Sequence, residues 1–442
     1  MNDRRLPADR DIWRIAAPMI LSNVSVPLLG MVDTGVTGHL ESPVYLGAVA
    51  VGATVFGFLY MGMNFLRMGT TGITAQRYGA NDNDGLRVSL GQALIVSLLI
   101  AVTLLALQLP IGHLAMSLIG AEPDVESFAL QYFSIRIWSA PGTLANYVLI
   151  GWFLGLQNAR VPLLIFLAIN ITNIILDLWF VLGLGMKVDG VALASVIAEY
   201  TGLAVALVFA VKALRARSGH WPFARLFNVR AYSAFFAVNA HLFIRTMALM
   251  FTFAFITAQG ARLGGLVLAA NAILINVQHL TAFALDGFAH AAEALVGKAV
   301  GEKRRDALEY SVRLALKWSL IFAVGFCLLY VALGPLLIRV LTDLPDVRST
   351  TMQYLPWLIV SPLVSVWSFL YDGVYIGATR SREMRDIMLI SAFVIFIPAW
   401  YLLQGFGNHG LWLAFTLFMA SRGIGMHIWY RRKVLPACPD IV

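Results

Sequence analysis

The sequence has few charged residues and few cysteines. Only 13% of its 442 residues are Asp, Glu, Lys or Arg, which excludes a soluble globular domain of this length. Its two cysteines, Cys327 and Cys438, lie in an apolar run and in the C-terminal tail. A framework of disulfide bonds is therefore excluded as well.

The sequence motifs of soluble enzymes are also absent. We find no Walker A motif, no GxSxG, no HExxH and no CxxC. Lys298 stands in Val-Gly-Lys-Ala, but no glycine-rich loop precedes it. We therefore expect neither an enzyme nor a protein driven by ATP, and we expect no cofactor.

The sequence instead has long hydrophobic runs. Hydrophobic residues make up 59% of the chain, and the mean hydropathy is +0.77. A transmembrane helix needs about 20 apolar residues. The runs predict an all-α polytopic membrane protein with twelve transmembrane helices: Ile12–Val36, Val44–Thr71, Val88–Ile111, Phe128–Leu154, Val161–Leu182, Val191–Val211, Ala231–Ala258, Leu266–Val296, Ser311–Leu333, Thr351–Ile376, Ile387–Leu403 and Leu411–Tyr430.

The positive charges indicate the orientation in the membrane. Most of the 32 Lys and Arg residues lie before the first run, in the even-numbered loops or after the last run. By the positive-inside rule both termini face the cytoplasm, as in a multi-pass protein of a bacterial inner membrane. This pattern accounts for the net charge of +8, so we expect no nucleic acid as a partner. The first run is too long for a signal peptide, and we expect it to be retained.

The chain contains an internal repeat at an offset of about half its length. Leu46 matches Leu268, Gly79 matches Gly301 and Gly151 matches Gly373, all at one spacing. The repeat predicts two six-helix lobes, residues 1–215 and 216–442. Because each lobe has an even number of helices, the lobes are parallel repeats. This plan is common in transporters that open alternately to each side, and a channel is the less favoured alternative. We expect a monomer.

Four polar residues fall at similar depth in the first half. Asp33, Asn173, Asp177 and Ser195 all lie in the outer part of their predicted helices. Carboxylate, amide and hydroxyl oxygens are ligands for a proton or a monovalent cation. A carboxylate within a span costs about 2.5 to 3.5 kcal/mol, which favours function for Asp33 and Asp177. The alternative is hydrogen bonding within helix packing, which is as well supported for Ser195.

Protonation of such a site would act as a switch. Burial and mutual repulsion of two carboxylates favour proton uptake by one of them. Neutralising Asp33 would also remove a counter-charge from a cationic substrate, which gives a direct reason for exchange. At the offset of the repeat, Asp177 corresponds to Ala399 and Asp33 to Phe255. We therefore expect the coupling site in the first lobe alone.

Other polar residues within the runs have competing interpretations. Asn170, Asp286 and Asp372 are candidates for a substrate cavity, although Asp286 and Asp372 are as well explained by pairing with Arg380 or neighbouring helices. Pro18 interrupts the hydrogen-bond ladder of the first run and is either a fixed kink or a hinge. The remaining charged residues are interpreted as structural ion pairs: Arg67, Arg136, Glu199 and Arg245. Metal binding by His279 and His290 is disfavoured because they are about 16 Å apart along a helix.

Two segments resemble one transporter family. The stretch Asp286-Gly-Phe-Ala-His-Ala-Ala-Glu-Ala-Leu-Val-Gly-Lys-Ala-Val-Gly, with Asp372-Gly-Val-Tyr-Ile-Gly-Ala-Thr-Arg, is similar to the multidrug and toxic compound extrusion (MATE) transporters, in particular to their DNA-damage-inducible (DinF) branch. The resemblance covers essentially the whole chain. It implies a cation-coupling site formed by Asp33, Asn173, Asp177 and Ser195, and a bending proline at Pro18.

The resemblance implies export of cationic or amphipathic drugs in exchange for H⁺ or Na⁺. We expect protons to be the coupling ion, although Na⁺ accepts the same oxygen ligands. A lipid-linked precursor flippase of the same superfamily is the alternative function. It would be expected to line its cavity with Arg and Lys, whereas the candidate groups here are mainly acidic or neutral. A membrane-embedded enzyme would require a metal-spaced or nucleophilic cluster, and the sequence contains none.

Overall fold

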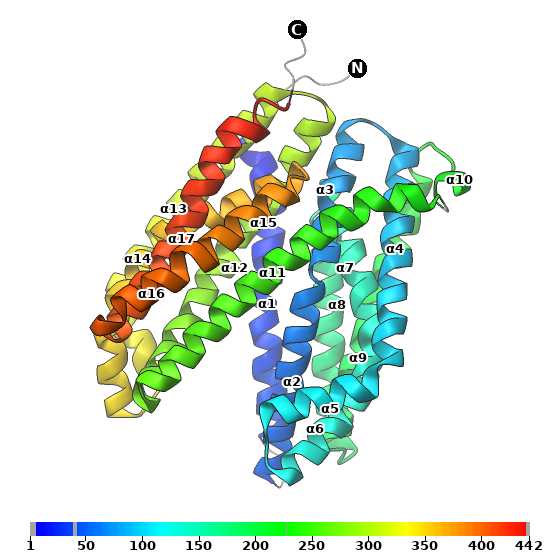
Figure 1. Cartoon of the computed structure of the whole chain (residues 1–442). Coiled ribbons are helices and arrows are strands. Elements are labelled where there is room, and N and C mark those ends of the chain that lie inside the picture. Colours follow the sequence, from blue (N-terminus) through cyan, green and yellow to red (C-terminus); the bar gives the residue numbers. More distant parts are fainter. Residues whose placement is uncertain (1–5, 39–41, 227, 439–442) are drawn as a thin grey trace. The chain divides into compact units, whose positions relative to one another are not determined.

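The computed structural model describes residues 6–38, 42–226 and 228–438, and within these ranges the chain is helical with no β-strand (Figure 1). This confirms the predicted all-α class. The α-helices are α1 (Asp9–Thr37), α2 (Pro43–Met63), α3 (Phe65–Gly79), α4 (Asn83–Ala106), α5 (Gln108–Ile119), α6 (Pro123–Arg136), α7 (Ala140–Gly155), α8 (Arg160–Asp177), α9 (Val188–Arg215), α10 (Phe223–Leu226), α11 (Val229–Leu263), α12 (Gly265–Gly301), α13 (Arg305–Leu341), α14 (Pro345–Gly377), α15 (Ser381–Leu389), α16 (Ile397–Leu403) and α17 (Asn408–Trp429).

The helices extend beyond the hydrophobic runs. Ten stretches in the described part of the chain are long and apolar enough to cross a membrane, for example Pro43–Gly79 and Arg305–Leu341. The predicted run Val44–Thr71 was therefore too short at its C-terminal end. Hydropathy marks only the apolar core of a membrane, whereas helical hydrogen bonds continue into the polar interface.

The internal repeat reappears in the helix boundaries. α2 and α12 begin at Pro43 and Gly265, and α6 and α14 begin at Pro123 and Pro345. Each pair has the offset seen in the sequence. The turns repeat as well, because Asn81 and its counterpart Lys303 both adopt φ 55°. A positive φ is uncommon for residues other than glycine, so its recurrence at matched positions supports duplication of the backbone itself.

Matched glycines set the closest helix packing in both repeats. A Cβ on Gly151 would lie 2.4 Å from the Arg67 carbonyl oxygen, and a Cβ on Gly373 would lie 2.1 Å from that of Ala289. Both distances are too short for any side chain. The absence of a side chain therefore lets α7 pack closely on α3 and α14 pack closely on α12.

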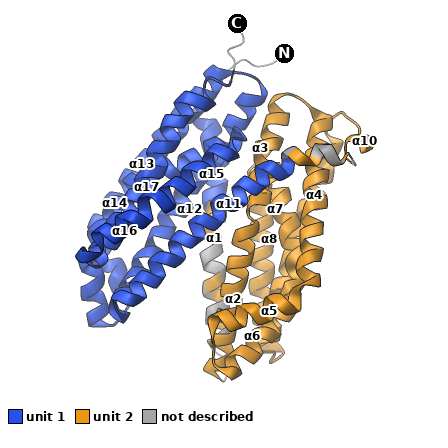
Figure 2. Cartoon of the chain, in the orientation of Figure 1, with its two compact units in different colours: residues 1–20, 235–442 blue, residues 21–234 orange. Residues whose placement is uncertain are grey.

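The chain separates into two compact units, coloured separately in Figure 2. Unit 1 takes in the chain up to Ile20 and again from Phe235 onward, and unit 2 comprises Leu21–Ala234. The expected boundary between residues 215 and 216 differs from this division. The contacts of α1 explain part of the difference: Trp13 packs edge-on against Phe288 at 5.4 Å and Trp318 at 5.1 Å, both in unit 1.

Unit 1 has an aromatic core between its last helices. Phe396, Phe415 and Phe418 are buried, and the rings of Phe415 and Phe418 stack at 6.1 Å. Ala399 and Phe255, the repeat counterparts of Asp177 and Asp33, pack against this core. At the positions where unit 2 has carboxylates, unit 1 therefore has hydrophobic packing.

Candidate functional site

Two of the predicted site residues lie on one face of α8. Asn173 and Asp177 are one helical turn apart, and they are 1% and 0% exposed. Immediately after Asp177 the helix widens into a π-helical segment, Leu178–Gly183. Such segments are rare and occur frequently at functional sites. The sequence therefore places a carboxylate in the interior at the point where the regular helix ends.

Ser195 joins this pair from the neighbouring helix. It lies on α9, which packs on α8 within unit 2, and its hydroxyl accepts a hydrogen bond from the Asn173 side-chain amide at 3.4 Å. The structure thus brings together Asn173 and Ser195, which are 22 residues apart in the sequence. The sequence predicts that the two residues lie at similar depth in the membrane, and their role as ligands of a coupling ion stays a prediction.

The fourth predicted residue, Asp33, belongs to α1, but its side chain lies outside the described residues. α1 contacts α8 at Asn170, whose side-chain amide donates to the Ser25 hydroxyl at 2.8 Å. Asp33 is eight residues beyond Ser25 in α1 and Asp177 is seven beyond Asn170 in α8, which corresponds to about 12 Å and about 10.5 Å along an ideal helix.

Asp372, a candidate substrate-cavity residue, is engaged by two buried arginines in unit 1. One carboxylate oxygen accepts from Arg422 at 2.9 Å and also from Arg245. Arg380, the partner considered from the sequence, instead pairs with Glu383 at 3.5 Å. The carboxylate is therefore neutralised from within unit 1.

Asp286 belongs to the same group of charges. It is partly buried on α12 and interacts electrostatically with Arg422. Two acids, Asp286 and Asp372, thus stand with two guanidinium groups in this part of unit 1. Further along α12, His290 Nδ1 lies 3.3 Å from Glu293 Oε2, and the Glu293 side chain is 1% exposed. These polar side chains of α12 therefore form contacts within unit 1.

Glu199 has a more specific environment than the ion pair that the sequence suggested. The side-chain amide of Asn146 on α7 donates to the Glu199 carboxylate at 3.0 Å and to its backbone carbonyl at 2.9 Å. A sequence signal was available, because Glu199 follows Ser195 by one turn of α9 and shares its face.

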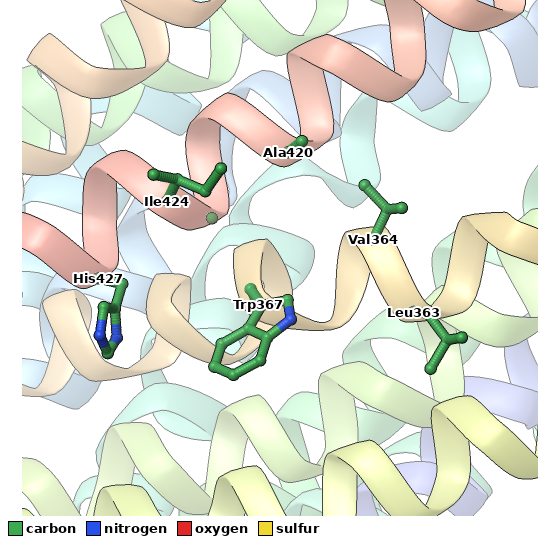
Figure 3. A pocket seen from close by; sticks show the side chains of 7 residues that line it. Leu363, Val364, Trp367, Ala420, Ile424 and His427 are labelled. Carbon is green, nitrogen blue, oxygen red and sulfur yellow. The ribbon is translucent and has the colours of Figure 1, made fainter.

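An apolar groove lies between α14 and α17 in unit 1. Its volume is about 440 Å³. Figure 3 shows the side chains of Trp367 and Val364 from α14, and those of Ile424 and His427 from α17, around this space. None of its lining residues is Asp, Glu, Lys or Arg. The groove therefore offers a mainly hydrophobic surface, and His427 is the ionisable side chain among its lining residues.

Long apolar helices, a duplicated backbone and polar groups inside the helix packing are features of a polytopic integral membrane protein. Comparison with known proteins identifies its family. The MatE family model matches residues 18–179 and 242–402, so the chain belongs to the MATE family.

One bacterial relative supports the DinF-like branch. The chain is 43% identical over 425 residues to the DNA damage-inducible protein F of Escherichia coli. The aligned region covers 96% of this chain and 92% of that protein. It is also 25% identical to multidrug and toxin extrusion protein 1 of Homo sapiens, over 96% of this chain and 76% of that protein. The chain is therefore a DinF-like MATE transporter.

The fold matches solved transporters of this family. A crystal structure of a MATE protein in complex with MaD3S superposes with a TM-score of 0.87 at 21% identity, covering 98% of this chain and 97% of that one. This agreement confirms the predicted all-α polytopic fold with twelve transmembrane helices in two lobes.

Proposed function

We propose that the protein is a proton-coupled antiporter that exports cationic or amphipathic compounds across a bacterial inner membrane, with both termini in the cytoplasm. The observation that carries this proposal is the buried group formed by Asn173, Asp177 and Ser195 in unit 2. The coupling ion binds to this group, and Asp33 is a further ligand. Na⁺ is the alternative ion, since it accepts the same oxygen ligands.

The charge balance of unit 1 supports a single coupling site. Asp372 is held by Arg245 and Arg422, and the repeat counterparts of Asp33 and Asp177 are hydrophobic. A cation entering unit 1 would meet a carboxylate that already has two positive partners. Unit 2 is therefore where ion binding alters the local charge.

Proton entry supplies enough energy for export. Moving one charge through roughly 150 mV is worth about 3.5 kcal/mol, and each pH unit adds about 1.4 kcal/mol. A proton bound at Asp177 or Asp33 removes the negative charge that attracts a cationic substrate. The two ligands thus exclude one another, and their exchange produces antiport without a nucleotide.

Pro18 is a candidate hinge within α1. It lies two residues before Ile20, where the helix passes from unit 1 to unit 2. Proline removes one hydrogen bond from the helical ladder and allows bending there. We propose that ion binding beyond this point changes the bend of α1 and so changes which side of the membrane the transporter faces.

The substrates are proposed from the names of the relatives. The human relative is named a multidrug and toxin extrusion protein, which supports export of drugs and toxic compounds. We propose that these are organic cations or amphipathic drugs and that the transporter acts as a monomer. Asn170 and Asp286 remain candidates for substrate contact. Asp372 would have to release one of its two arginine partners before it could bind a substrate. The flippase alternative is less well supported, because Arg245 and Arg422 both form ion pairs with Asp372.

Transport into inverted membrane vesicles tests the coupling site. Uptake of a fluorescent organic cation is measured with a proton gradient and, separately, with a sodium gradient. We expect Asp33→Asn and Asp177→Asn to lower proton-driven uptake by at least about tenfold, which corresponds to about 1.4 kcal/mol. Ser195→Thr keeps the hydroxyl and should retain more activity than Ser195→Ala.

Asp343→Asn is the matched control, because the Asp343 side chain is exposed. Its uptake should equal that of the unaltered protein. Full gradient-driven uptake by both aspartate variants of unit 2 would refute the coupling site. Uptake that follows only the sodium gradient would replace the proton by Na⁺ as the coupling ion.

A further inference from the structure

A second carboxylate lies inside unit 2, away from the coupling group. Glu199 is near the middle of the 28-residue helix α9, one turn from Ser195. Because α9 has the length and composition of a membrane span, this position is close to the centre of the membrane. An acidic side chain at such depth is a candidate for function.

The contact with α7 holds the Glu199 carboxylate in place. Asn146 is 2% exposed, and its amide nitrogen donates to both the Glu199 carboxylate and the backbone carbonyl of the same residue. Gly202 packs beside this contact, since a Cβ there would lie 2.4 Å from the Ile169 side chain and 3.3 Å from the Asn146 amide nitrogen. Both hydrogens of the amide are therefore used by one acidic residue.

Two buried polar side chains lie beside this contact. The side-chain oxygen of Asn146 is buried and has no hydrogen-bond partner among the described residues. Thr143 is 4% exposed, and its hydroxyl interacts with both the Glu199 carboxylate and the Tyr60 hydroxyl. Thr143 therefore links the carboxylate to Tyr60.

The hydroxyl groups continue beyond Thr143. The Tyr60 hydroxyl of α2 lies 2.9 Å from the Ser139 hydroxyl, and both residues are buried. Thr143, Tyr60 and Ser139 thus form a row of hydroxyl groups that starts next to the Glu199 carboxylate. Hydroxyl groups both donate and accept, which is what proton transfer along a row requires.

The charged and titratable groups that interact with Glu199 lie on three neighbouring helices. They are Tyr60 on α2, Arg136 on α6 and Tyr147 on α7. The guanidinium of Arg136 also lies over the Phe56 ring at 5.2 Å. The guanidinium of Arg136 is thus a positive charge that acts on the Glu199 carboxylate.

We propose that Glu199 is a second proton-binding position of unit 2, held by Asn146 and reached through the hydroxyl groups of Thr143, Tyr60 and Ser139. A proton from water bonds to a carboxylate oxygen and is released to water again, with water completing the row beside Thr143. A metal cation is disfavoured there, because Asn146 presents its N–H groups and not its oxygen to the carboxylate. Sodium and other hard cations require several converging oxygens.

This inference goes beyond the proposed function and is tested without transport. The full chain is reconstituted in lipid nanodiscs, and infrared absorption of protonated carboxyl groups is followed while the pH is changed. We expect Glu199→Gln to lose one titrating carboxyl signal that the unaltered protein shows. Glu122→Gln, at an exposed residue, is the control and should retain that signal.

Further variants separate the possible outcomes. Glu199→Asp keeps a carboxyl group and should restore a titrating signal, which guards against misfolding of the glutamine variant. Asp177→Asn should retain the Glu199 signal, so failure of the coupling site and failure of this inference are distinguishable. Identical titrations of the unaltered protein and Glu199→Gln would make Glu199 a permanent ion-pair partner and overturn the proposal. Loss of the signal on adding sodium at constant pH would assign a metal cation and also overturn it.

Discussion

At the scale of single residues, the two units place buried carboxylates in different environments. Asp177 is fully buried, and one turn before it on α8 Asn173 donates to the Ser195 hydroxyl. Asp372 is buried against two guanidinium groups. The same residue type is thus a partner of two arginines in unit 1 and a proposed ligand of the coupling ion in unit 2.

This difference predicts the effect of removing Asp372 on stability. Asp372→Asn would leave Arg245 and Arg422 buried without their shared counter-charge, and breaking such a buried group costs about 3 to 5 kcal/mol. Thermal unfolding in lipid or detergent measures the loss. Asp343→Asn removes an exposed pair with Arg348 and should cost less than about 1 kcal/mol. Equal unfolding temperatures for the two variants would contradict the structural role of Asp372.

The sequence alone predicted part of this residue-level picture. The spacing of Asn173 and Asp177 within an apolar run indicates one helix face, because helical periodicity is local. The pairing of Asp372 with Arg245 was not predictable, since 127 residues separate them. Only the packing of α11 near α14 decides which of several buried charges becomes the partner.

At the scale of helices, duplication governs the closest contacts. α3 packs on α7 in unit 2 and α12 packs on α14 in unit 1, in each case through a glycine at a matched position. The sequence showed the shared spacing of Gly151 and Gly373, which identified a repeat. It did not show that both glycines lie against a backbone carbonyl, because that contact joins helices distant in the chain.

The glycine contact predicts a specific defect. Gly373→Ala would place a Cβ 2.1 Å from the Ala289 carbonyl oxygen, so α12 and α14 would have to separate. Overpacking of this kind costs about 1 to 3 kcal/mol, measurable as a lower unfolding temperature. Gly325→Ala on α13 is the control, since nothing lies within 4 Å of its Cβ. A control as unstable as Gly373→Ala would show that any helical glycine is needed, whatever its packing.

At the scale of the whole molecule, charge distribution predicts the orientation. In a variant without cysteine, Cys327→Ala with Cys438→Ser, single cysteines are introduced as Asp343→Cys and Ser218→Cys. The loops before α14 and after α9 should face opposite sides under the positive-inside rule. A membrane-impermeant maleimide applied to intact cells should label position 343 alone, and position 218 only after permeabilisation. The reverse pattern would place both termini outside.

The sequence by itself determined the membrane class, the repeat and the asymmetry between its halves. Each of these depends on local composition or on one constant offset. Local composition and a constant offset can both be read from the linear sequence. Hydrophobic length requires a membrane, and the change from Asp177 to Ala399 requires different chemistry in the two halves.

Only the tertiary structure decided which polar groups meet. Asn173 lies against Ser195, Asn146 holds Glu199, and Asp372 binds two arginines. Each contact joins different helices, and the rotation of a helix about its axis is set by the packing of all its neighbours. A polar residue in an apolar run is therefore evident from the sequence, but its partner follows from the fold.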